Sequence, residues 1–137
     1  MCPGKSCRKL FHSLKTLELN HVAVFVTDVP RSCRFYCEVL RLKEMPRPAF
    51  NFPGAWFRLG ETQELHIIGE RPDQGVTRER GDHFALRVDD IEAWRIHLES
   101  LGAIIRGPQL RPDGATQIFI GDPDGHLIEL FVPGEGP

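Results

Sequence analysis

The sequence predicts an α+β fold in which two βαβββ modules form a curved, eight-stranded mixed sheet. Three observations support this fold class in the 137-residue chain. The chain contains an internal repeat, and each copy reads as a strand, a helix and three short apolar segments with alternating faces. Glycines lie between these segments, where turns are needed: Gly60, Gly107, Gly114 and Gly121.

The repeat is clearest where each copy begins. The stretch "NHVAVFVTDVPRSCRFYCEVL" starts at Asn20, and "DHFALRVDDIEAWRIHLESLG" starts at Asp82. Each has histidine as its second residue and an Asp-led turn before a helical segment, so His21 matches His83 at an offset of 62 residues. In the later strands the offset is 63, and His66 falls on Glu129. Matched landmarks in matched secondary structure indicate two copies of one structural unit.

The elements follow in the same order in both copies. We expect strands near 18–26, 42–47, 53–59 and 63–69 in the first, and near 82–88, 103–107, 115–120 and 126–132 in the second. Helical spacing of apolar residues predicts one helix in each copy, on Cys33, Tyr36, Val39 and Leu40 and on Ile91, Trp94, Leu98 and Leu101. Asp28 and Asp90 precede these helices as expected N-cap or turn residues.

These boundaries give the expected domain organisation. Residues 1–16 form an N-terminal tail or an extra helix, residues 17–132 form one domain with modules 17–69 and 82–132, and residues 133–137 form a C-terminal tail. The polar link at 70–81 separates the modules.

Composition excludes several classes of partner. The formal net charge is −2, and no stretch has the density of Lys and Arg that a nucleic-acid face needs. No apolar run approaches the roughly 20 residues of a membrane span, and the basic N-terminus lacks the apolar core of a secretory signal. We therefore expect a cytoplasmic protein whose partner is a small molecule. Cys33 and Cys37 share a helical face and are expected to be reduced thiols rather than a metal pair.

The stretch "DPDGHLIEL" raises a question about Glu129, because strand alternation places this carboxylate on the same face as Leu127 and Phe131. An unpaired carboxylate is costly to bury. If two equivalent modules pack about a pseudo-two-fold axis, the matched pairs His21–His83 and His66–Glu129 face each other. Three imidazoles and a carboxylate in an apolar cup suit one divalent ion of Zn, Ni, Co, Mn or Fe. The unmatched His12, His97 and His126 are expected to have no such role.

The residues of the repeat, together with "FIGDPDGHLIELF", resemble the vicinal oxygen chelate superfamily, which includes glyoxalases, bleomycin-resistance proteins and extradiol dioxygenases. The resemblance covers residues 17–132, and "FPGAWFRLGETQELHII" is similar to the glyoxalase-I-like branch. It implies the paired βαβββ fold and a metal bound by His21, His66, His83 and Glu129. It also implies Lewis-acid chemistry on two neighbouring substrate oxygens, with Glu129 as ligand and proton acceptor, and a homodimer.

The chain departs from individual branches of this group. Phe25 stands where glutathione-dependent glyoxalase I carries an arginine, and His66 where it carries a carboxylate or amide. The chain has no lysine after Lys43, which disfavours fosfomycin thiol transfer, and its single tyrosine, Tyr36, lies on a helix. The four ligand-type side chains favour a metal-dependent lyase or isomerase, because a metal-free binder does not need them. An extradiol-type dioxygenase and a metal-free sequestering protein of the bleomycin-resistance kind are the alternatives. Trp56, Phe57 and Phe119 are pocket or core candidates, and Arg47, Arg58 and Arg87 are candidates for holding an acidic substrate group.

Overall fold

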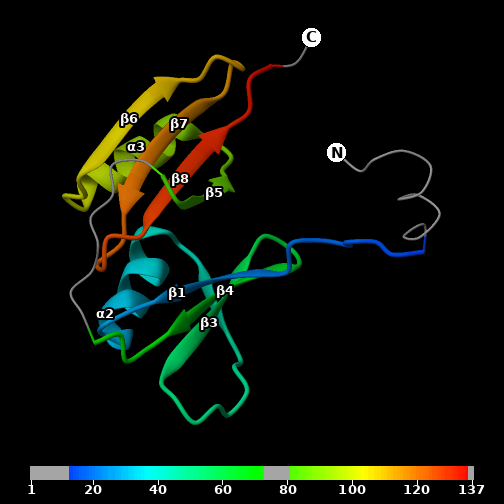
Figure 1. Cartoon of the computed structure of the whole chain (residues 1–137). Helices are drawn as coiled ribbons and strands as arrows, with labels where there is room; N and C mark the ends of the chain where they lie inside the picture. Colours follow the sequence, from blue (N-terminus) through cyan, green and yellow to red (C-terminus); the bar gives the residue numbers. More distant parts are fainter. Residues whose placement is uncertain (1–12, 73–80, 136–137) are drawn as a thin grey trace.

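The computed structural model describes residues 13–72 and 81–135. The first half contains β1 (His21–Phe25), α2 (Val29–Arg34) continued by one π-helical segment, η1 (Phe35–Val39), and then β2 (Lys43–Met45), β3 (Gly54–Leu59) and β4 (Gln63–Ile68). The second half contains β5 (His83–Arg87), α3 (Ile91–Ser100), β6 (Ile105–Leu110), β7 (Thr116–Gly121) and β8 (Leu127–Val132) (Figure 1). Each half is a βαβββ unit, and the predicted α+β class is confirmed.

The eight strands form two hydrogen-bonded sheets of four with the same topology. Their strand orders are β1-β4-β3-β2 and β5-β8-β7-β6. In each sheet the first pair is parallel and the other pairs are antiparallel. A parallel pair needs a long crossover, which the helix and the two intervening strands of each half provide.

Strand register supports the equivalences of the internal repeat. His66 lies opposite Ala23, and Glu129 lies opposite Ala85. Each of these alanines is two residues after the histidine that starts the first strand of its half. On the other side of the same strands, Trp56 lies opposite His66 and Phe119 lies opposite Glu129. Equivalent residues therefore occupy equivalent positions in the two sheets.

The expected helix starts are also present. The Asp28 side chain accepts a hydrogen bond from the Arg31 backbone N–H, and the Asp90 side chain accepts from the two N–H groups of Glu92 and Ala93. Both are N-cap arrangements that satisfy donors left free at a helix start. Three strands differ from expectation. Strand β1 begins later, at His21, and β2 ends earlier, at Met45. Strand β6 continues past Gly107 to Leu110, through a register shift between Arg106 and Gln109 and a cis Gly107–Pro108 bond.

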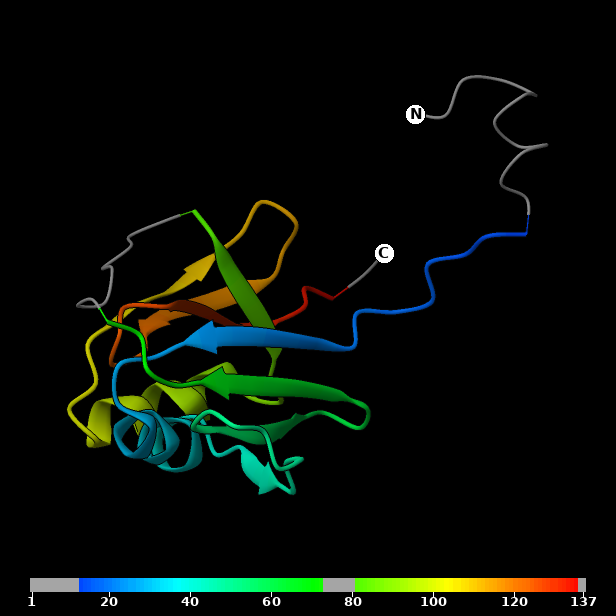
Figure 2. The same ribbon diagram turned by 60° about the horizontal axis from the view of Figure 1, so that its bottom comes forward.

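The core lies between the sheets and the helices and is shared by both halves. It comprises Val24, Val26, Tyr36, Leu40, Ala55, Phe57, Leu59, Leu65, Ile67, Leu98, Ile118, Ile120, Ile128 and Leu130. The helices lie side by side on one side of the molecule (Figure 2), where His97 Nε2 lies 2.9 Å from the Val39 carbonyl oxygen. Because strand side chains alternate, His21, His66, His83 and Glu129 lie on the opposite, helix-free faces.

Buried polar contacts join the halves beneath the β7–β8 turn. The Tyr36 hydroxyl donates to Asp122 Oδ2 at 2.7 Å, and His126 Nδ1 lies 2.9 Å from the same oxygen. Asp124 accepts from the Thr27 hydroxyl at 2.8 Å and forms a 3.3 Å ion pair with Arg31. The DPDG turn thus carries two buried carboxylates that hold the first half against the second.

These contacts form the seam between the two halves, and they shift the pKa values of Asp122 and Tyr36. Burial alone would raise the pKa of Asp122, but hydrogen bonds from His126 and Tyr36 outweigh it and hold the pKa below its usual value. Burial, followed by the nearby Asp122 carboxylate, raises the pKa of Tyr36 well above its usual value. Tyr36 therefore stays a neutral donor and Asp122 an ionised acceptor near neutral pH.

Several expectations fall on the ends and the link. Residues 1–12, with Cys2, Cys7 and His12, lie outside the described residues, as do 73–80 of the link and the last two residues of the C-terminal tail. Residues 13–16 are exposed and contain no helix or strand. Cys33 is half-buried, Cys37 is exposed, and both are free thiols. No helix within 13–72 and 81–135 is long and apolar enough to cross a bilayer.

Candidate metal centre

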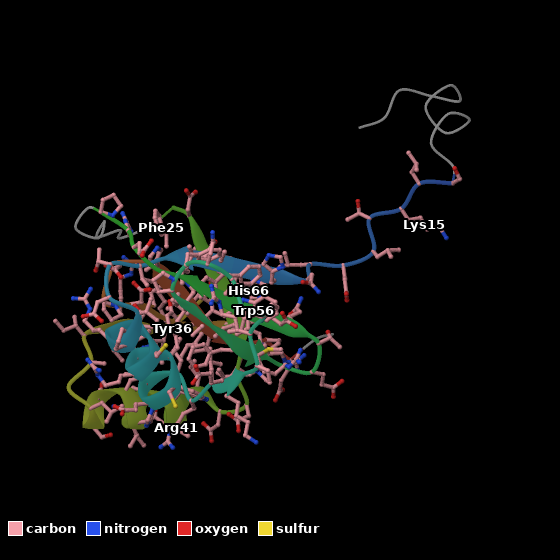
Figure 3. All side chains as sticks on the ribbon, turned by 90° about the horizontal axis from the view of Figure 1, so that it is seen from below. Lys15, Phe25, Tyr36, Arg41, Trp56 and His66 are labelled. Atoms are coloured by element: carbon pink, nitrogen blue, oxygen red, sulfur yellow. The ribbon has the colours of Figure 1, made fainter. Side chains whose placement is uncertain are left out.

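The first pair of candidate ligands lies on the helix-free face of the first sheet. The rings of His21 and His66 stack with centroids 4.1 Å apart and planes inclined by 16°. On its other side His66 stacks on Trp56 at 3.9 Å, with planes 1° apart (Figure 3). The neighbouring β3 and β4 strands place Trp56 against His66, and the parallel β1 strand places His21 beside them. His66 is therefore the middle ring of a stack of three.

The second pair lies on the equivalent face of the second sheet. His83 Nε2 is 3.2 Å from Glu129 Oε1. The Phe119 ring stands edge-on to His83 at 5.6 Å, in the position that Trp56 takes in the first sheet. Glu129 is only 5% exposed, as strand alternation and its apolar neighbours predict.

The partner that sequence reasoning missed for Glu129 is Arg111. Its Nη1 donates to Glu129 Oε2 at 2.8 Å, while its Nη2 forms an ion pair with Asp113. Arg111 lies in the β6–β7 turn, and its guanidinium also stands over the Phe131 ring at 5.4 Å. The cost of burying Glu129 is thus offset by an arginine as well as by His83. Arg111 lies outside the alternating strands, between β6 and β7, so no sequence pattern marks it as a partner of Glu129.

The structure brings the four predicted ligands together as two pairs. Within residues 13–72 and 81–135, no three or more His, Cys, Asp or Glu side chains lie in an arrangement that holds a metal ion. His21 and His83 nevertheless line one hollow of about 260 Å³ between the halves, together with Glu64. We call the pair His21 and His66 the first candidate half-site, or first half-site, and the pair His83 and Glu129 the second.

Hydrogen bonds fix the ring nitrogens of two of the histidines. His83 Nδ1 lies 2.7 Å from the Gly81 carbonyl oxygen, and His21 Nδ1 lies 2.9 Å from Asn20 Oδ1. A carbonyl oxygen only accepts, so Nδ1 carries a hydrogen in both rings, and Nε2 is the nitrogen that remains to bind a proton or a metal ion.

The second half-site has the geometry of two adjacent metal ligands. His83 Nε2 faces a carboxylate oxygen at 3.2 Å, a contact that is favourable when Nε2 carries a proton or when a metal ion lies between the two atoms. Donors that each bind one metal at about 2.0–2.2 Å are about 3 Å apart when they are neighbours in its coordination sphere. Two imidazoles with free Nε2 lone pairs and one buried carboxylate are a donor set that fits a divalent metal.

His66 is arranged differently from the other two histidines. Its Nε2 lies 2.9 Å from Glu64 Oε1, and the other oxygen of Glu64 lies 3.7 Å from Arg58. Glu64 is two residues before His66 on β4 and shares its face. Sequence reasoning did not single out Glu64, because a carboxylate on the strand face away from the core ordinarily faces water.

The remaining candidates divide between core and surface. Phe57 is fully buried core, whereas Trp56 and Phe119 lie on the helix-free faces beside the half-sites. Arg58 pairs with Glu64, Arg47 stands over Phe50 and Phe52, and Arg87 is exposed. His97 lies at the helix contact, with Nε2 beside the Val39 carbonyl oxygen, and His126 lies in the seam, with Nδ1 beside Asp122 Oδ2.

Comparison with known proteins places this arrangement in a family. The model of the Glyoxalase/Bleomycin resistance protein/Dioxygenase superfamily matches residues 18–130. A probable lactoylglutathione lyase of Synechocystis sp. is 31% identical over 122 residues, which cover 82% of this chain and 93% of that protein. The glutathione transferase FosA of Serratia marcescens is 33% identical over 118 residues, covering 83% of this chain and 79% of the relative.

Solved structures agree with the sequence comparisons. A putative glyoxalase family protein from Bacillus anthracis superposes with a TM-score of 0.76 at 27% identity, covering 88% of this chain and 98% of that one. The family match spans both βαβββ halves and both half-sites. The chain belongs to the Glyoxalase/Bleomycin resistance protein/Dioxygenase superfamily.

Proposed function

We propose that this protein is a metal-dependent, glyoxalase-like enzyme that carries out lyase or isomerase chemistry on a small substrate with oxygens on neighbouring carbons. The observation that carries the proposal is the contact between His83 Nε2 and Glu129 Oε1 at 3.2 Å. With Nδ1 committed to the Gly81 carbonyl, that contact needs a cation between its two atoms. Family membership and relatives named as lactoylglutathione lyases support a divalent metal over a proton.

The candidate ligands are His21, His66, His83 and Glu129. When bound, a divalent ion such as Zn, Ni, Co, Mn or Fe supplies Lewis acidity toward the substrate oxygens. Glu129 directs Oε1 toward the site and Oε2 toward Arg111, so this carboxylate is held in one orientation. We assign it a ligand role first; as a proton acceptor it must exchange its contact with Arg111 for the substrate proton.

Two copies of the chain complete the site in this proposal. The helix-free faces that carry the half-sites include the exposed Ala23 and Ala85 and Phe25, whose side chain is 44% exposed. A second copy related by two-fold symmetry can cover these faces and bring the first half-site of one chain to the second half-site of the other. This arrangement supplies the convergence that the described residues of a single chain lack.

The test combines elemental analysis with thermal unfolding of the purified protein. Chelator should remove a stoichiometric divalent metal and lower the melting temperature, and metal should restore it, because a ligand that binds only the folded state stabilises it. Metal-loaded protein is then incubated in D₂O with α-hydroxyketones and hemithioacetals. Exchange of the carbon-bound proton beside the carbonyl supports lyase or isomerase chemistry.

Other outcomes select the alternative functions. Cleavage of catechols in air by the Fe(II)-loaded protein, with no exchange in D₂O, selects the dioxygenase. Tight binding of an aromatic ligand by protein that contains no metal and responds to no chelator selects the sequestering protein. Either result contradicts the proposal.

A further inference from the structure

A hollow of about 440 Å³ lies between the two halves, at the end of β5 that is remote from His83. The first half contributes the chain after η1 and the β3–β4 turn to its lining, and the second half contributes the last residues of β5 and part of α3. Small-molecule sites typically have volumes of about 300–1,000 Å³. Figure 3 shows Arg41, one of the lining residues, apart from His66 and Trp56. The hollow is therefore separate from the candidate metal centre.

Most of the lining of this hollow is apolar. Leu59 and Leu130 are buried, and Leu86 and Trp94 are half-buried. Trp94 Nε1 donates to Asp89 Oδ1 at 3.3 Å, so the polar atom of the indole already has a partner. The rest of the ring is apolar surface, which favours an apolar or aromatic ligand.

Two exposed arginines without a partner give the hollow its charge. Arg41 lines it from the first half and Arg87 from the second. Within residues 13–72 and 81–135, neither side chain makes a hydrogen bond, an ion pair or a ring contact. Among the described lining residues Asp89 supplies the only carboxylate, and it already accepts from Trp94 and from the Asp90 N–H. Two arginines against one aspartate leave an excess of one positive charge, which a single negative group complements.

The backbone at Arg41 supports a role for its side chain. Arg41 follows the C-cap Leu40 with a φ of 59°, in the left-handed region. In the second half, Gly102 follows the C-cap Leu101 with a φ of 71°, and both C-caps have a φ of −91°. Glycine adopts this conformation freely, whereas a residue with a Cβ destabilises it. The first half thus ends its helix with the less favourable residue, and that residue places a guanidinium in the hollow.

We propose that this hollow is a second ligand site, and that it binds a small organic monoanion with an apolar or aromatic body. Arg41 and Arg87 hold the carboxylate or sulfonate of the ligand from opposite halves, since a guanidinium donates parallel hydrogen bonds to such groups. Trp94 and the leucines contact the apolar body. The site requires no metal, so it is independent of the proposed catalytic function.

The experiment uses the full-length protein and the fluorescent monoanion anilinonaphthalenesulfonate, with phenylnaphthylamine as an uncharged probe of similar shape. The parent carries Trp56→Phe, which leaves Trp94 as its single tryptophan. The sulfonate should bind at one saturable site with energy transfer from Trp94. Arg41→Met and Arg87→Met keep an apolar stem and should each weaken sulfonate binding about tenfold, without changing that of the uncharged probe. Arg34→Met, an exposed arginine of α2, is the control and should bind as the parent does.

Arg41→Gly separates binding from folding. Glycine suits the left-handed conformation, so the melting temperature should be at least that of the parent, while sulfonate affinity falls as in Arg41→Met. A fall in affinity that is accompanied by a lower melting temperature would instead assign Arg41 a role in folding and would contradict the inference.

Three other results would overturn the second site. Unchanged affinity in both methionine variants removes the arginines from it. Weaker binding in His83→Ala, or after metal is added, places the probe at the metal centre. Affinity that falls as protein concentration rises shows that a second copy fills the hollow. Because the binding measurements need neither metal nor activity, the inference and the proposed function can fail separately.

Discussion

The two halves of this protein use one backbone template for different chemistry. At matched positions the first half has His66 beside Trp56, and the second has Glu129 beside Phe119. The carboxylate of the first half, Glu64, lies two residues earlier on its strand, where the second half has the buried Leu127. The two halves thus share strand register but differ in the residues at matched positions. Those residues determine where each half places its carboxylate.

The two β-turns that precede the last strand of each half differ in the same way. The turn between β3 and β4 is exposed at Gly60 and Glu61, whereas the turn between β7 and β8 buries Asp122 and Asp124 under the first half. At the β7–β8 turn the second half therefore provides the acceptors, Asp122 and Asp124, and the first half provides the donors. The β7–β8 turn of the second half therefore holds the first half in place, whereas the β3–β4 turn has no such role in the described part of the chain.

The largest expected effect comes from separating the two half-sites genetically. Glu129→Ala and His21→Ala should each abolish metal binding and activity, because each removes one ligand from every site. If sites form between chains, a heterodimer of the two variants, isolated with two different affinity tags, contains one intact site and should bind about half the metal of wild type. His12→Ala is the control and should leave both properties unchanged.

A heterodimer that binds no metal would contradict assembly between chains. If each site forms within one chain, neither chain of this heterodimer has all the ligands, since one lacks Glu129 and the other lacks His21. A monomer by sedimentation at micromolar concentration that still binds metal leads to the same conclusion. In either case the hollow shared by His21 and His83 within one chain becomes the metal site.

The seam should show the next largest effect, on stability. Tyr36→Phe removes a buried donor to an ionised carboxylate and should lower the free energy of unfolding by about 1.5–3 kcal/mol, measured by urea denaturation. Glu61→Gln, in the equivalent exposed turn of the first half, is the matched control and should change it little. Equal effects of the two substitutions would contradict the asymmetry between the turns.

The same seam predicts a pH dependence. Because the pKa of Asp122 is lowered in the folded state, its contribution to stability is fully present above the unfolded-state pKa, about 3.9. That contribution is lost as the pH falls through the lower, folded-state pKa. Asp122→Asn should therefore flatten the acid limb of stability against pH, and an unchanged acid limb would exclude this carboxylate as its source.

Much of the fold followed from the sequence because periodicity and repetition are local properties. Alternation gave the strands, Asp28 and Asp90 marked the helix starts, and the offset from His66 to Glu129 predicted the register that the sheets confirm. The continuation of β6 beyond Gly107 was not predictable, because a glycine–proline pair reads as the end of a strand.

The site was predicted less completely than the fold, for a physical reason. Which residues share a face follows from alternation, but which side chains meet depends on sheet pairing and on turns. Arg111 reaches Glu129 from 18 residues away through the β6–β7 turn, and Glu64 reaches His66 along its own strand instead of facing water. Each contact gives a predicted metal ligand a side-chain partner within the protein, and neither contact corresponds to a recognisable sequence motif.

Arg111 gives a smaller effect that separates an arginine from a metal as partners of Glu129. Arg111→Met should lower the melting temperature of the metal-free protein, because it leaves a buried carboxylate with one cation fewer. Added metal should then raise the melting temperature more in this variant than in wild type, because the ion supplies the missing charge. Arg106→Met is the control, because the Arg106 guanidinium stands over the Phe119 ring rather than against Glu129. Equal increments in all three proteins would contradict the idea that Glu129 lies in the metal site.

The smallest expected effect compares how the two strand-starting histidines are held. His83 Nδ1 donates to the Gly81 backbone carbonyl, which no side-chain substitution removes, whereas His21 Nδ1 donates to the side chain of Asn20. Asn20→Ala should therefore weaken metal binding by about tenfold, because His21 loses the partner that fixes its tautomer and ring orientation. Asn20→Asp keeps an acceptor at the same place and should retain affinity within that range. If Asn20→Ala binds metal as wild type does, the stack on His66 alone is enough to orient His21, and the two histidines are held by different means altogether.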